Sequence, residues 1–200
     1  MEETIRYHGA AVGQVRIEEA GLYWHLDARC ECPADGVLRL YGVEGFRSEP
    51  FGVFVPEAGV LTLQKSVSRH SAPALPTRWL LGREAEGFRP WAGSVEGQEI
   101  LDGMICPGAD PDSVLLAVSA ETEPVPLAEY ASVMEPRRLD GRNYLALELR
   151  GGLPVLPEAD ETETPAEAPS ISEQELDGAV VGAEDLLVDP GVGDPAPEPV

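Results

Sequence analysis

Residues 22–32 read Leu-Tyr-Trp-His-Leu-Asp-Ala-Arg-Cys-Glu-Cys, with an apolar side chain at every even-numbered position and a polar or amphipathic one at every odd position. An alternation of period two places these sets on opposite faces of a half-buried strand, whereas a helix would scatter them. Val15 and Ile17 alternate with polar residues just upstream, and the intervening Ala20-Gly21 suits a tight turn. The stretch predicts a β-hairpin and contains the clearest strand signal in the chain.

Short apolar runs separated by Gly and Pro continue this pattern along the chain. They predict further strands over residues 37–41, 51–55, 60–67, 79–81 and 114–118. Asp140-Gly141 is typical of a type I′ turn, and alternating leucines follow it up to Leu149. A helix is expected only over residues 126–134. Parallel strands need a long crossover connection, usually a helix, so antiparallel pairing is expected. We expect a mostly β fold, an antiparallel meander that forms a sandwich or a partly open barrel.

The charges divide the chain in two. Residues 1–153 hold all 14 Lys and Arg and all 12 aromatic residues, and their 23 Asp and Glu give a net charge of −9. Residues 154–200 hold 13 Asp and Glu, eight prolines and no basic or aromatic residue. Such a segment cannot bury enough apolar surface to offset the entropy of ordering it. We therefore predict a β-rich globular body over 1–153 and an acidic, Pro-rich disordered tail over 154–200.

The composition argues against several classes of protein. The start, Met1 to Thr4, lacks a basic segment followed by an apolar run, and no stretch has the length of a membrane span. Three cysteines do not make a disulfide framework, so a cytoplasmic location is expected. The net charge of −22 opposes contact with phosphate backbones, so nucleic acid and membrane are not expected as partners.

Cys30 and Cys32 are the weak candidates for a metal site, because thiolates bind zinc. Both continue the apolar face of the strand in residues 22–32, where cysteine behaves as a small buried side chain. A complete site would need Cys106 and one of three histidines, His8, His25 or His70. Core packing is the favoured interpretation, and no cofactor is expected.

No catalytic signature is present in the sequence. His70 lies between serines, but neighbouring Ser and His do not imply a triad, and a Gly-x-Ser-x-Gly motif is absent. Residues 84–112 contain no clear pattern, so they either hide short strands or form the functional surface. The alternative function is thus a small hydrolase-like or metal-dependent enzyme that uses this region.

Aromatic side chains are the candidates for partner binding in the body. Tyr23 and Tyr41 lie opposite the leucine rows of their strands and could project from the sheet, or could pack in a second buried face. Trp91 lies in the unpatterned region. In the tail, a capping box at Ser172 precedes an apolar cluster that could dock on a partner, with candidates Leu176, Val180, Val181, Leu186 and Leu187. The default interpretation is a tail that only adds solubility.

Several segments resemble a group of uncharacterised small β-rich bacterial proteins with no known activity. They are Gly-Leu-Tyr-Trp (21–24), Arg-Leu-Tyr (39–41), Gly-Val-Phe-Val-Pro-Glu-Ala-Gly (52–59) and Phe-Arg-Pro-Trp (88–91). The resemblance covers about the first hundred residues and implies nothing about substrates. The leading hypothesis is a non-enzymatic interaction or ligand-binding protein, with another protein as its partner and an open oligomeric state.

Overall fold

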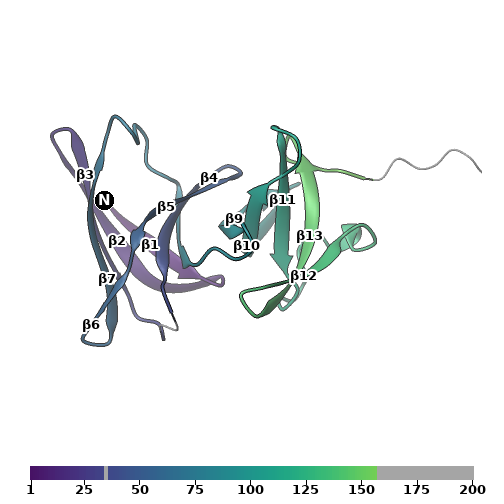
Figure 1. Ribbon diagram of the computed structural model, residues 1–200, viewed down its shortest axis with the longest axis horizontal. Coiled ribbons are helices and arrows are strands. Elements are labelled where there is room, and N and C mark those ends of the chain that lie inside the picture. Colours follow the sequence, from purple (N-terminus) through teal and green to yellow (C-terminus); the bar gives the residue numbers. More distant parts are fainter. Residues whose placement is uncertain (34–35, 157–200) are drawn as a thin grey trace, which may run out of the picture. The chain divides into compact units, whose positions relative to one another are not determined.

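The computed structural model describes residues 1–33 and 36–156. The chain divides into a unit from Met1 to Glu158 and a unit from Ala159 to Val200. The described residues all belong to the first unit (Figure 1). The predicted disordered tail begins at residue 154, but Pro154 lies in a strand that pairs with Leu149, and the Val155 N–H donates to the Glu148 carbonyl. The rest of the predicted tail, beyond residue 156, lies outside the described part.

Eight strands form the first sheet, in the order β5-β4-β8-β1-β2-β3-β7-β6. Their bounds are β1 (Glu2–Tyr7), β2 (Ala10–Ala20), β3 (Tyr23–Cys30), β4 (Arg39–Glu44), β5 (Arg47–Val53), β6 (Val55–Glu57), β7 (Val60–Ser68) and β8 (Arg78–Gly82). The end strands β5 and β6 are separated in the chain by Phe54 alone, so the sheet curls into a nearly closed barrel (Figure 1). The β1–β8 pair is parallel, which an antiparallel meander does not anticipate.

The second sheet has the order β12-β13-β11-β10-β9, and the short strand β14 also pairs with β13. Its strands are β9 (Arg89–Val95), β10 (Gln98–Pro107), β11 (Ser113–Ser119), β12 (Glu135–Leu139), β13 (Arg142–Arg150) and β14 (Leu153–Pro154). All its pairs are antiparallel. The mostly β prediction is confirmed, and residues 84–112 hold β9 and β10, the first of the two interpretations of that region.

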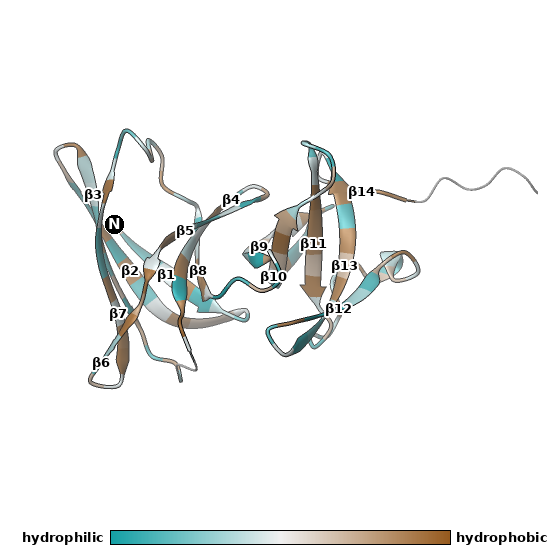
Figure 2. Cartoon of the chain, in the orientation of Figure 1, coloured by the Kyte–Doolittle hydropathy of each residue, from teal (hydrophilic) through white to brown (hydrophobic). Residues whose placement is uncertain are grey.

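The barrel interior follows the alternation that the sequence predicts. Leu26, Ala28 and Cys30 are buried, while the residues between them are exposed. A second apolar cluster contains side chains of both sheets, among them Tyr41 and Leu80 from the first and Trp91 and Ile105 from the second. Figure 2 shows the hydrophobic residues that run along β11 and β13. The two sheets therefore share part of their core.

The helix expected over residues 126–134 is reduced to one 3₁₀ turn, Ala128–Tyr130. Leu127 has a φ of 58°, in the left-handed region, and its N–H donates to the Gln98 side chain at 2.9 Å. An α-helix cannot pass through that backbone conformation. Leu127 and Met134 are nonetheless buried, so their spacing serves packing. In the described part of the chain, no helix has the length and apolar character needed to cross a membrane.

Proline occurs in every strand at the edge of a sheet. The edge prolines are Pro50 in β5, Pro56 in β6, Pro90 in β9, Pro136 in β12 and Pro154 in β14. Among the interior strands that the structure describes, only β10 contains a proline, its last residue Pro107. Proline lacks the N–H that a further strand would need, so this placement opposes pairing of the edges with another chain.

Candidate functional site

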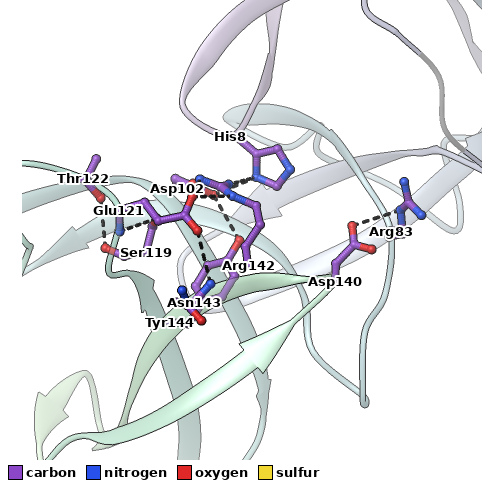
Figure 3. Close-up of polar contacts among 10 residues, drawn as sticks. All are labelled: His8, Arg83, Asp102, Ser119, Glu121, Thr122, Asp140, Arg142, Asn143 and Tyr144. Carbon is purple, nitrogen blue, oxygen red and sulfur yellow. Dashed lines mark hydrogen bonds and ion pairs between the residues drawn. The ribbon is translucent and has the colours of Figure 1, made fainter. Parts of the chain in front are cut away.

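A cluster of polar side chains surrounds Asp102 of β10, whose side chain is only 8% exposed (Figure 3). Arg142 of β13 donates from Nη1 to Asp102 Oδ2 at 2.7 Å, and the Tyr144 hydroxyl donates to Oδ1 at 3.5 Å. His8 Nδ1 lies 3.2 Å from the same Oδ1. A buried carboxylate is stable only with such partners, and here they come from both sheets.

Arg142 joins Asp102 to a second carboxylate. Its Nε and Nη2 donate to Glu121 Oε2 at 3.0 and 2.8 Å, so one guanidinium bridges two acids. Glu121 lies between β11 and β12 and also accepts from the Asn143 N–H. The fixed fork of arginine suits this bridging role, which lysine cannot reproduce.

His8 is positioned by the tight turn that joins β1 to β2. His8 and Gly9 have φ values of 49° and 79°, as a two-residue hairpin turn requires. His8 Nδ1 is within hydrogen-bonding distance of Arg142 Nη1 as well as Asp102. One ring nitrogen either accepts from the arginine or donates to the carboxylate, so only one of these bonds exists at a time.

The ionisation of the cluster follows from these contacts. Burial by itself would raise the pKa of Asp102, but the hydrogen bonds and charges of His8 and Arg142 prevail and lower that pKa. Hydrogen bonding to Arg142 lowers the pKa of Glu121. Burial, followed by the Asp102 charge, raises the pKa of the Tyr144 hydroxyl. Two carboxylates and one guanidinium are thus charged at neutral pH.

The space beside this cluster is small. The cavity lined by His8, Asp102 and Tyr144 has a volume of about 30 Å³, which is enough for a water molecule. Pockets that bind organic ligands have volumes of several hundred Å³. No serine, threonine or cysteine in the described ranges forms a hydrogen bond with His8. The cluster can anchor the β1–β2 turn to the second sheet, and it has no space for an organic substrate.

The predicted thiol and histidine ligands lie apart. Cys30 is in the barrel core, where burial and the neighbouring Cys32 raise its pKa to about 12, and Cys106 packs in a separate cluster of the second sheet. His25 contacts Ser66, and His70 follows β7 in an exposed turn. Within residues 1–33 and 36–156, no group of three or more His, Cys, Asp or Glu could hold a metal ion.

The three aromatic candidates for partner binding differ in exposure. Tyr23 is 49% exposed and projects from the first sheet, which is the first of the two interpretations. Tyr41 instead packs in a second buried face, the other of the two interpretations, because the second sheet covers that face of β4 and buries the ring. Trp91 is also buried, where it stacks on Phe46 and donates to the Gly45 carbonyl at 2.8 Å. The tail candidates lie outside the described residues.

An exposed apolar surface occurs where the first sheet closes, and sequence reasoning missed it. Val37, Val53 and Val55 are 63%, 48% and 54% exposed; we call these three residues the valine strip. The buried Leu38 and Phe54 point into the barrel, and the Phe54 N–H donates to the Leu38 carbonyl. The valines beside them therefore point outward. The sequence Val53-Phe54-Val55 could have indicated this surface. In a strand, side chains alternate between the two faces, so when Phe54 points into the barrel both valines point outward.

Charged side chains of both signs lie beside the valine strip. Asp27, Arg29 and Glu57 line, with Val53 and Val55, a hollow of about 480 Å³ on the outside of the barrel. Arg39 is exposed and directly opposite Val53 in the β4–β5 ladder. None of these four charged residues forms an ion pair with another described residue. The surface therefore has both an apolar centre and uncompensated charges.

Comparisons with models of known protein families, with curated proteins and with solved structures find no match for this chain. The geometry of the Asp102 cluster and of the valine strip is therefore the basis for any functional conclusion.

Proposed function

We propose that this chain is a non-enzymatic binding protein that recognises a partner through the valine strip. The observation that carries the proposal is the exposure of three neighbouring valines on the outer face of the barrel. Single exposed apolar residues are common on soluble proteins, but a contiguous group bordered by polar residues is typical of an interaction site. The adjoining hollow is of the size that a partner side chain or a small ligand fills.

The prolines of the edge strands favour recognition by a face of the sheet. A partner that added a strand to β6 would meet Pro56, and one that added to β12 would meet Pro136. Both positions lack the donor that main-chain pairing uses. Side-chain contacts with the valine strip need no such donor.

The alternative enzyme, centred on residues 84–112, has one observation in its favour. Asp102 from that region lies beside His8, a pairing that many hydrolases use to orient a histidine. Arg142 competes for the same ring nitrogen, and the neighbouring cavity has the volume of a water molecule. These features favour an anchoring role for the cluster and support the binding proposal.

A cytoplasmic bacterial setting belongs to the same proposal. Its support is chemical: the three cysteines are unpaired, as is usual in a reducing compartment, and Cys30 is packed in the core as a thiol. The acidic tail is proposed to accompany the binding body.

Selection from a random peptide display library tests the proposal. The full chain is the target, and the full chain with Val53→Ser and Val55→Ser is used to remove peptides that bind elsewhere. We expect peptides that bind the unchanged chain at least tenfold more tightly than the variant, because the two valines supply the apolar contact. Leu153→Ser, at a residue 62% exposed on β14, is the matched control and should leave these affinities unchanged. Recovery of no strip-dependent peptide would contradict the proposed function.

A further inference from the structure

The charges around the valine strip identify the kind of partner that fits it. Asp27 and Arg29 lie two residues apart on β3, while Arg39 and Glu57 belong to β4 and β6. Two are acidic and two are basic, and all four lack an ion-pair partner within the described ranges. A complementary surface must supply two bases, two acids and an apolar centre.

We infer that the partner at the valine strip is a second copy of this chain, joined face to face about a twofold axis. This inference rests on the proposed function and specifies its partner. In a twofold interface each surface meets its own copy, so the surface must be complementary to itself. The valine strip, together with the two acidic and two basic residues around it, meets that requirement.

A purely acidic or purely basic partner fits the same surface less well. An acidic segment would pair with Arg29 and Arg39 but would be repelled by Asp27 and Glu57. A basic segment would pair with the two acids but would be repelled by the two arginines. The charges of the four residues around the valine strip sum to zero, although the chain carries a net charge of −22. Contact through this neutral area keeps like charges of two acidic chains away from the interface centre.

The fold also constrains how two copies could meet. The prolines of β5 and β6 oppose joining of the barrels edge to edge. The valines instead lie on the outer face beside the hollow, where those of a second copy could pack. Three valines per chain form a small apolar centre, so the dimer is expected to be reversible and to depend on concentration.

Sedimentation velocity of the full chain measures the association. Over about 10 µM to about 1 mM protein at about 0.15 M salt, we expect a shift from monomer to dimer. Val53→Ser with Val55→Ser should raise the dissociation constant at least tenfold, whereas the control Leu153→Ser should leave it unchanged. A chain that stays monomeric across this range would overturn the inference.

Exchange of the charges tests whether the two surfaces are the same. The acidic variant carries Arg29→Glu and Arg39→Glu, and the basic variant carries Asp27→Lys and Glu57→Lys. Each variant alone should lose dimerisation, because all four charged residues around its valine strip then have the same sign. An equimolar mixture should restore a one-to-one complex. Unchanged self-association of either variant, or a mixture that stays monomeric, would overturn the twofold interface.

The two proposals can fail separately. If the chain is monomeric but the display experiment still yields peptides that require Val53 and Val55, the binding function stands and only the second copy is excluded. If neither dimer nor strip-dependent peptide is found, both are wrong. Amide NMR spectra of each variant show whether the fold is retained, so a loss of binding is not confused with unfolding.

Discussion

At the scale of single residues, Asp102 is a position where one side chain connects the two sheets. Replacement by Asn removes the charge that Arg142 and His8 face, from a side chain that is only 8% exposed. We expect Asp102→Asn to lower the free energy of unfolding by about 2–3 kcal/mol at neutral pH, since Arg142 keeps Glu121 as a second partner. Chemical denaturation measures the difference.

The pH dependence of that difference has a definite sign. The pKa of Asp102 is lowered in the folded protein, so its contribution is present above the ordinary aspartate value of 3.8 and is lost as pH falls through the lower folded value. The stabilities of the two proteins should therefore converge below about pH 4. Asp110→Asn, which removes an exposed partner of Arg150, should cost less than about 1 kcal/mol. Equal effects of the two substitutions would argue against a buried anchor at Asp102.

At the scale of elements, β12 illustrates how an edge strand is kept from pairing. Leu139 and Arg142 flank the two-residue turn Asp140-Gly141, so they form a hydrogen-bonded pair, and such pairs alternate along the hairpin. Arg138 and Pro136 consequently turn their backbones outward. Of these two residues, only Arg138 has a backbone N–H to donate at this edge, and its charged side chain opposes pairing with a further strand.

Replacement of both residues should expose the edge. We expect Pro136→Val with Arg138→Val to add a donor and an apolar side chain, and so to cause self-association that increases thioflavin fluorescence on incubation. Pro73→Val, in an exposed loop, is the control and should behave as the unchanged chain. If the double variant shows no more fluorescence than this control, the edge prolines do not have the protective role described above.

The same elements show what the sequence could predict. The alternation in residues 22–32 predicts β3 because one of its faces is solvated, and Asp-Gly predicts the β12–β13 turn. In β4, four consecutive residues are buried, so no alternation marks its faces and the sequence left both orientations of Tyr41 open. In β10 a register shift between Ile100 and Gly103 interrupts the period, which hides that strand.

The Asp102 cluster could not be predicted for a different reason. His8 lies 94 residues before Asp102, and Arg142 lies 40 residues after it. No local pattern connects positions that only the pairing of strands brings together. Arg142 directly follows the Asp140-Gly141 turn, and nothing in that local sequence indicates its two carboxylate partners.

At the scale of the whole described body, the shared apolar cluster makes the two sheets thermodynamically dependent on each other. Tyr41, Val43 and Leu80 of the first sheet are buried against residues of the second, so loss of either sheet exposes the core of the other. The body should consequently unfold in one transition. Separate folding of the two sheets would require each to keep a complete core of its own.

Fluorescence and hydrogen exchange can examine this dependence directly. Trp79 reports on the barrel core and Trp91 on the shared cluster, so single-tryptophan variants should give coincident denaturation curves. Tyr41→Ala should destabilise the body by about 3–5 kcal/mol, as expected for a large buried aromatic side chain. It should also reduce the protection of amides in β11 and β13 as much as in β4, because the cavity opens in the core that these strands share. Loss of protection confined to β4 and its neighbours would instead indicate two independently stable sheets.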